Sequence, residues 1–451
     1  MNRKIITFAI VIWCVFANTA AYAADTSGVL TVANFNEWML QKTATGDWAG
    51  LRPSLENAGI SISSNYTTDI GGNPTGGLRQ VFKYSGFYSL TTAFDFEKIA
   101  SIKGLALKVG NFVASGRDIS APIGSFYSPQ EVFTSGDYFF GELDLSLSML
   151  DDTLTLEAGR LFAGDVFAVS PMFQYYLTSA VDGRLSAIPS DVFFPHYSIA
   201  AWGTRVTYQP NKNWHLIAGV YNADSDVANP SKHGLDFSFD TNKGCLAVGQ
   251  LTYKHGQDKG DLVLPGSVSF GSYYESSRFT DLSNPDKHWH GNYGFYLMAD
   301  KMIYKGEWPD YEGPEYLRSS AMLAERIKKP FNSQLSSLPL DRPKGLTAWG
   351  AASLAPEDNI NTQTYEIAAG LVYQGLPPNR NRDVTAFAFI LGHFSDKLEG
   401  QNEEMILELN HRFQLGTWCY ITPDIQYIIN PNGRSNVDNA LVLGVETSFD
   451  F

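Results

Sequence analysis

The clearest pattern in the chain is the alternation of apolar and polar residues over its last twelve positions, Ala440 to Phe451, which read ALVLGVETSFDF. Successive side chains of a strand point to opposite faces, so one face here is apolar and the other is mixed and polar. The apolar face carries Leu441, Leu443, Val445, Thr447, Phe449 and Phe451. Such a strand is typical of a membrane barrel with lipid outside and water inside. It is equally compatible with a half-buried strand of a soluble sandwich.

Comparable alternation recurs in about 16 segments, each near the length that a tilted membrane strand needs. The segments are residues 59–68, 79–97, 104–116, 138–149, 152–163, 199–209, 213–222, 244–254, 264–275, 291–303, 345–355, 363–374, 383–394, 404–415, 418–430 and 440–451. The pattern predicts an all-β protein, a transmembrane antiparallel up-and-down barrel of about 16 strands.

The connections between these segments alternate between short and long. Tight turns are expected at 150–152, 210–212 and 416–417, and long connections at 117–137, 164–198 and 223–243. Short turns at one end and long loops at the other are typical of outer-membrane barrels. The connection 164–198, about 35 residues long, is the candidate for a loop that folds inward and narrows the channel. A large external loop is the alternative of equal weight.

Two further segments stand outside the strand pattern. Residues 304–344 form a long insertion where strand parity predicts a periplasmic turn, and 315–329 could form a short helix within it. This insertion is either a periplasmic contact site or a tolerated addition. Residues 47–59 read as a short helix at the periplasmic mouth, with Asp47 as its N-cap and Gly59 as its stop.

The N-terminus resembles a secretory signal. Arg3 and Lys4 precede an apolar core at residues 5–17, and Ala21-Tyr22-Ala23 supplies a small-x-small cleavage pattern. The expected organisation is a signal peptide at 1–23, an N-terminal periplasmic segment at 24–58 and the barrel at 59–451. The mature chain therefore leaves the cytoplasm.

Composition agrees with this class. Aromatic residues make up 14% of the chain, charged residues 18%, and there are 40 glycines. The formal charge of -14 becomes -16 once Arg3 and Lys4 are removed, which argues against a nucleic-acid partner. The mature chain would keep Cys245 and Cys419, which could pair in an oxidising periplasm or stay as thiols.

Catalytic and metal-binding signatures are missing from the sequence. There is no GxSxG elbow, no HExxH and no phosphate-binding loop, and the 8 histidines show no ligand spacing. We therefore expect no enzyme activity, no cofactor and no metal.

Strand alternation selects the charged residues that would face the lumen, because a charge at mid-membrane on the lipid face costs roughly 2–4 kcal/mol. Arg117 follows a strand directly, and its alternative role is a salt bridge within the loop. Arg160 conflicts with the rule, because it shares parity with Leu154 and Leu156. Either a bulge near Gly159 turns it inward or it lies beyond the membrane at the strand end. The candidate lumen residues are Arg79, Lys83, Arg117, Glu142, Asp144, Arg160 and Arg205, with Arg79, Glu142 and Arg205 preferred.

Short motifs along the chain resemble those of the carbohydrate-selective porin (OprB) family. They occur in the family's order from about residue 46 to the C-terminus, and the insertion at 304–344 is the clearest departure. The motifs are GDWAGLR at 46–52, GGLR at 76–79, AGRLFAGDVF at 158–167, WGTRV at 202–206, GVYN at 219–222, HGLDF at 233–237 and PDIQYIINP at 423–431.

The resemblance implies a single 16-stranded barrel in the outer membrane of a Gram-negative bacterium, through which glucose and related sugars diffuse passively, without a cofactor. It implies a constriction lined by arginines and a few carboxylates, and it favours the pore for Arg160. It also implies that the terminal Phe451 is part of the signal read by the barrel assembly machinery. Porins of this type occur as single barrels or as trimers.

An arginine-lined pore suits sugars for a physical reason. A sugar that loses water in a narrow pore needs partners for its hydroxyls, and guanidinium and carboxylate groups supply fixed donors and acceptors. Binding must remain weak for the cargo to leave. The alternatives are a general or anion-preferring porin and, from other classes, a barrel hydrolase or an adhesion protein.

Overall fold

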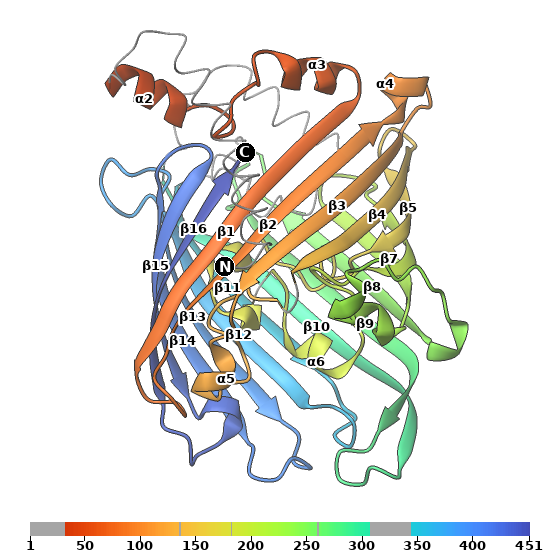
Figure 1. Ribbon diagram of the computed structural model, residues 1–451, viewed down its shortest axis with the longest axis vertical. Coiled ribbons are helices and arrows are strands. Elements are labelled where there is room, and N and C mark those ends of the chain that lie inside the picture. The colour runs from red at the N-terminus through yellow and green to blue at the C-terminus, as the bar shows by residue number, and fades with distance from the viewer. Residues whose placement is uncertain (1–31, 135–136, 182, 259–260, 307–343) are drawn as a thin grey trace.

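Sixteen antiparallel strands close into a barrel in which each strand pairs with its sequence neighbours and β1 pairs with β16 (Figure 1). The computed structural model describes residues 32–134, 137–181, 183–258, 261–306 and 344–451. All sixteen strands expected from the sequence are present. They are β1 Ile60–Thr75, β2 Phe82–Asp95, β3 Leu105–Gly116, β4 Tyr138–Met149, β5 Leu154–Leu161, β6 Ala201–Tyr208, β7 Trp214–Asn222, β8 Cys245–His255, β9 Gly266–Thr280, β10 His288–Lys305, β11 Gly345–Leu354, β12 Gln363–Gln374, β13 Val384–Phe394, β14 Glu403–Gln414, β15 Cys419–Ile429 and β16 Ala440–Asp450.

The helical elements are short and lie outside the strands. The α-helices are α2 Val32–Met39, α3 Leu51–Asn57, α4 Phe96–Ala100, α5 Ser120–Ile123 and α6 Ala187–Asp191. The 3-10 turns are η1 Phe173–Tyr175, η2 Ser179–Val181, η3 Ser225–Ala228, η4 Pro230–Lys232, η5 Thr241–Lys243 and η7 Pro431–Gly433. Among the described residues, no helix has both the length and the apolar character needed to cross a membrane.

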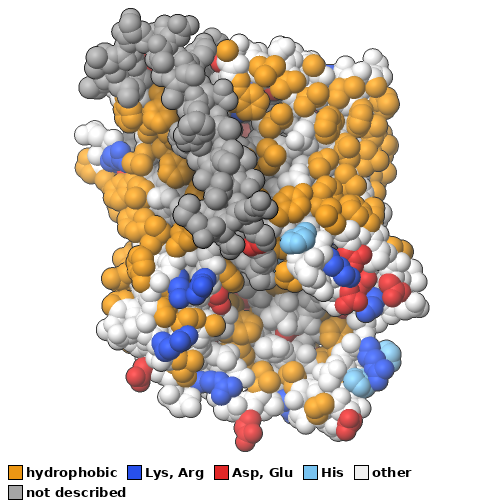
Figure 2. All heavy atoms as spheres, in the orientation of Figure 1, with side chains coloured by type: hydrophobic (Ala, Val, Ile, Leu, Met, Phe, Trp, Pro, Cys, Tyr) orange, Lys and Arg blue, Asp and Glu red, His pale blue; other side chains and the backbone are white. Residues whose placement is uncertain are grey.

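Alternation along the strands sorts side chains between the two surfaces of the barrel, as expected. In β16, Glu446 and Ser448 are buried inside, whereas Leu443 is 48% exposed on the outer face. In β14, Leu409 is exposed outside and Glu408 is buried inside. Apolar side chains cover much of the visible outer wall in Figure 2, and charged ones gather toward one end. This outer surface is the one that lipid would cover.

The two ends of the barrel differ. We call the end that carries α2, α3 and α4 the helix end, and the opposite end the loop end; they are at the top and bottom of Figure 1. The N-terminal segment is fastened to the helix end, where the Ala44 N–H donates to Asp450 O over 2.8 Å and the Trp418 indole donates to Trp38 O over 3.0 Å.

The expected helix at 47–59 is confirmed as the shorter helix α3, but Asp47 does not cap it. The N-cap is Gly50, at φ 87°, and no side chain caps the helix there. Gly59, at φ 90°, follows the helix directly and allows the chain to turn into β1.

Two connections from the loop end fold into the barrel. The connection 162–200, between β5 and β6, includes η1, η2 and α6 and reaches β14. Because β14 is eight strands from β6 in a barrel of sixteen, the connection crosses the lumen. The expectation that 164–198 folds inward is therefore confirmed. The connection 117–137, which contains α5, also reaches β14.

The main apolar core lies inside the barrel, between these connections and the wall. Phe173, Val181 and Ile188 from the connection 162–200 belong to one cluster with Ala388 and Ile406 of the wall. Burial of such apolar surface contributes about 25 cal/mol per Å². The lumen wall is therefore partly apolar, and the inward connections pack against its apolar part.

Two expectations fall on residues that the structure does not describe. The signal peptide at 1–23 lies outside the described residues, and so does nearly all of the insertion 304–344 beyond Gly306. The cysteines are described: Cys245 is exposed, Cys419 is buried, and both are free thiols rather than a disulfide.

Candidate pore lining and constriction

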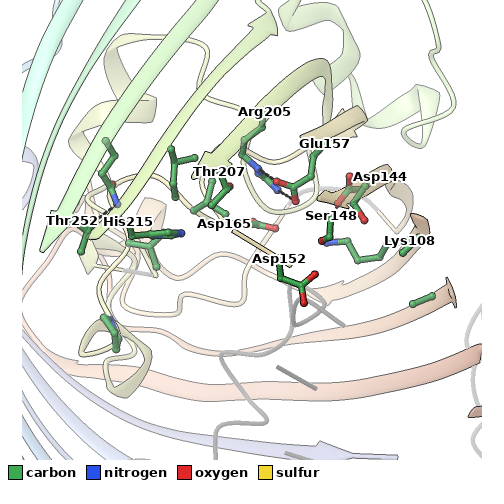
Figure 3. A pocket seen from close by; sticks show the side chains of 18 of the residues that line it. Lys108, Asp144, Ser148, Asp152, Glu157, Asp165, Arg205, Thr207, His215 and Thr252 are labelled. Carbon is green, nitrogen blue, oxygen red and sulfur yellow. Dashed lines mark hydrogen bonds and ion pairs between the residues drawn. The ribbon is translucent and has the colours of Figure 1, made fainter. Parts of the chain in front are cut away.

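A cavity of about 1460 Å³ occupies the helix-end part of the lumen. It extends from the turn at Leu150–Asp152, at the helix end, to residues 165–175 of the inward connection. Its lining includes charged and polar side chains from β3 to β8, which Figure 3 shows around one space: Lys108, Asp144, Glu157, Arg205, Thr207, His215 and Thr252. The inward connection therefore forms part of the wall at the inner end of the cavity.

Arg205 and Glu157 form a bidentate salt bridge on this wall. The two residues stand directly opposite each other in the β5–β6 register. Arg205 Nε donates to Glu157 Oε2 over 2.8 Å, and Nη2 donates to Oε1 over 2.7 Å, as drawn in Figure 3. Arg205 Nη1 also donates to the backbone oxygen of Phe162 over 3.0 Å. A planar guanidinium bound at both carboxylate oxygens keeps a fixed orientation.

A second charge group lies on the neighbouring strands. Lys108 of β3 is 2.9 Å from Glu142 Oε1 and 3.7 Å from Asp144 Oδ2 of β4. Asp165, at the start of the inward connection, lies close enough to interact electrostatically with this group. Burial, together with the nearby Glu142, raises the pKa of the Asp165 carboxyl well above its ordinary value. The wall thus presents ammonium, guanidinium and carboxylate groups close together.

Three members of this wall, Lys108, Glu157 and Asp165, were not selected from the sequence. Alternation would have found two of them: Glu157 has the parity opposite to Leu154 and Leu156, and Lys108 stands directly across from Asp144. For Asp165 no strand pattern exists, because it lies in a loop that only the fold brings into the lumen.

Glu142, Asp144 and Arg205 face the lumen as expected, but three other candidates lie elsewhere. Arg79 precedes β2, on an exposed turn at the loop end, so its expected place in the strand is wrong. Lys83 is in β2 on the inward parity, half-buried at the loop end. Arg117 is exposed just after β3. None of these three lines the cavity.

Arg160 points outward, so the expected place of this residue in the pore is wrong. Leu143, Arg160 and Trp202 are directly paired across β4, β5 and β6, and no bulge interrupts either register. The three side chains therefore share the outer face, as strict alternation requires.

Arg160 is nevertheless buried, because the connection between β7 and β8 folds over it. Its guanidinium donates to the backbone oxygens of Gly234 and, over 2.9 Å, of Ala200. It also lies 5.1 Å from the ring of Phe237. The residue fastens an external loop to the outer wall instead of lining the channel.

Replacing Arg160 with alanine should release this loop. The loss of two hydrogen bonds from a charged donor predicts a cost of about 1.5–3 kcal/mol for each bond. We expect faster protease cleavage in residues 230–239 of the folded protein and unchanged channel conductance. A changed conductance with intact protease resistance would contradict the outward placement.

Groups of metal ligands are absent from the site: no set of three or more His, Cys, Asp or Glu side chains is arranged to hold a metal ion anywhere in the described chain. The cavity wall can instead offer paired donors and acceptors to a polar solute.

Sequence and structure comparisons agree with this architecture. Residues 79–451 match the family described as carbohydrate-selective porin, OprB family. The putative porin QuiX of Acinetobacter baylyi is 23% identical, over 95% of this chain and 98% of that protein. Porin B of Pseudomonas aeruginosa is 22% identical, over 99% of this chain and 98% of that protein. The high-pH structure of Pseudomonas putida OprB shares the fold, with a TM-score of 0.75, 22% identity and coverage of 91% of this chain and 99% of that one.

Proposed function

The chain belongs to the carbohydrate-selective porin (OprB) family of the outer membrane, and on this premise we propose that it passes neutral sugars such as glucose by passive diffusion. The observation that carries the proposal is the wall formed by Arg205–Glu157 and by Lys108 with Glu142 and Asp144. Each cation on this wall has a carboxylate beside it.

Paired charges suit a neutral, hydroxyl-rich solute. An unpaired cation in a narrow pore attracts anions, whereas a paired one keeps hydrogen-bonding groups at little net charge. Arg205 makes three hydrogen bonds to protein, and a guanidinium has five N–H groups. The wall could therefore bind hydroxyls directly, and weakly enough to release them.

Liposome swelling tests the proposal. Liposomes that contain the purified barrel should swell faster in glucose than in a neutral non-sugar of similar size. Equal rates would contradict sugar selectivity.

The anion-preferring alternative is not favoured by the cavity. Eight acidic side chains line it against five lysines and arginines. Because fixed negative charge attracts cations, we expect the reversal potential of the channel in a KCl gradient to indicate preference for K⁺. The preference should weaken at high salt, where the Debye length falls to about 3 Å. A preference for Cl⁻ would support the alternative.

For orientation and assembly, we propose that the helix end faces the periplasm and that the assembly machinery recognises the terminal strand with Phe451. The short turns at the helix end support the orientation. Phe451 directly follows β16, the strand that closes the barrel against β1, and its N–H donates to Ser64 O of β1 over 2.9 Å.

A further inference from the structure

Hydrogen bonds from side chains of β14 help to hold both inward connections inside the lumen, and these side chains do not line the cavity. The inner face of β14 carries Glu404, Glu408, Asn410 and Arg412, all buried and all in contact with inward backbone. We define these four residues as the β14 row.

The carboxylates of the β14 row accept backbone N–H groups in pairs. Glu408 Oε1 accepts from Leu177 N over 2.8 Å, and Oε2 accepts from Thr178 N over 3.1 Å. Glu404 does the same with Phe126 and Tyr127, at 2.8 and 3.1 Å. One carboxylate thereby satisfies two backbone donors that have left water, and such bonds are stronger than neutral ones.

The donors of the row bind the neighbouring carbonyls. Asn410 Nδ2 donates to Tyr175 O, and Arg412 Nη2 donates to Gln174 O, both over 2.8 Å. Moving along β14 from 408 to 412, the contacts move along the connection from 178 to 174. The side chains thus pair with the loop backbone in order, as a strand would in a sheet.

Similar single contacts occur on two other strands. Glu366 of β12 accepts from Ala187 N over 2.8 Å, and Glu275 of β9 accepts from Phe193 N over 2.6 Å. Hydrogen bonds between wall side chains and the loop backbone thus recur along the connection from residue 174 to 193. Gln174 and Tyr175, at one end of it, line the cavity.

We propose that the β14 row consists of positioning residues that fix the inward connections and thereby set the aperture of the channel. The inference rests on the proposed channel function only for its transport readout. A carboxylate is the required group, because glutamine has one accepting oxygen and would turn its NH₂ group toward a second N–H. We call Glu404 and Glu408 the clamp residues. Loss of the Glu408 carboxylate should loosen the backbone at 177–178 without altering the barrel.

The test compares Glu408→Gln and Glu404→Gln with Glu403→Gln. Glu403 is the matched control, because it is the same residue type on the same strand, half-exposed on the opposite face. Hydrogen–deuterium exchange in detergent-solubilised barrels should accelerate about tenfold at residues 177–178 in Glu408→Gln, which corresponds to about 1.4 kcal/mol. It should accelerate at 126–127 in Glu404→Gln and at neither place in the control.

Single-channel recording in KCl supplies the second readout. Both clamp variants should show larger or fluctuating conductance, and a higher size limit for neutral solutes, while Glu403→Gln behaves as the wild type. Unchanged exchange and conductance in folded clamp variants would overturn the proposal. If exchange and conductance change as expected in the variants but the wild type shows no preference for glucose, the positioning role of the β14 row is supported and the sugar proposal fails.

A wild-type measurement covers the case in which the variants fail to fold. The amides of Phe126, Leu177 and Thr178 should exchange more slowly than those of the external loop 230–239. Equal, fast exchange at both places would overturn the proposal without any substitution.

Discussion

Replacing Arg205 with alanine should destabilise the barrel by about 3–5 kcal/mol, because it leaves the buried Glu157 without its partner in a poorly solvated wall. Arg205 and Glu157 are 6% and 7% exposed, and the substitution also removes the bond to Phe162 O. Equilibrium unfolding in detergent measures the loss. The same variant should lose the preference for glucose in liposome swelling, since the fixed guanidinium donors are gone.

Two comparisons separate stability from transport. Arg380→Ala breaks a similar two-point bridge, to the buried Asp383 at the helix end, but Arg380 itself is half-exposed and Asp383 keeps the N–H of Gln414. We therefore expect a smaller loss of stability than in Arg205→Ala, and unchanged sugar flux. The double variant Arg205→Met/Glu157→Gln should recover much of the stability, because no unpaired charge stays buried. It should not recover glucose preference. A double variant that transports glucose normally would contradict the role of the ion pair.

Deleting Phe451 should strongly reduce the amount of barrel in the outer membrane while leaving the channel properties of any inserted protein unchanged. Phe451 does not line the cavity, and its N–H donates to Ser64 O, which joins the end of β16 to β1. Heat-dependent electrophoretic mobility of outer-membrane fractions measures folded barrel, and single-channel conductance measures the lumen.

Phe449→Ala is the matched control for this deletion. Phe449 is also aromatic and has the same parity in the terminal strand, where it lies 6.4 Å from the ring of Trp418. Its loss removes packing in the folded barrel but keeps the terminal residue, so insertion should persist. Normal insertion without Phe451 would show that the terminal aromatic carries no assembly signal in this chain.

Regular alternation made the barrel predictable. A strand has a period of two, and lipid on one side with water on the other enforces that period over every membrane-spanning segment. The sixteen strands, their facing and the placement of Glu142, Asp144 and Arg205 follow from this local rule. For Arg160 the rule was correct as well, and the family resemblance was the wrong guide.

Two wrong predictions concern residues at or beyond the ends of the alternating segments. Arg79 was placed in a strand that begins three residues later, at Phe82. Asp47 was taken as an N-cap that the structure assigns to Gly50. Both errors concern element boundaries, which depend on turn geometry and on contacts distant in sequence.

The sequence by itself determined the barrel, the number of its strands and the residues on each face, because a repeated local pattern is sufficient for these. Only the tertiary structure decided what fills the lumen. Glu404 and Glu408 lie more than two hundred residues from the backbone groups of the inward connections that they bind, and Asp165 enters the charged group from a loop. Contacts of this kind depend on how a loop crosses a closed barrel, and no local period records that path.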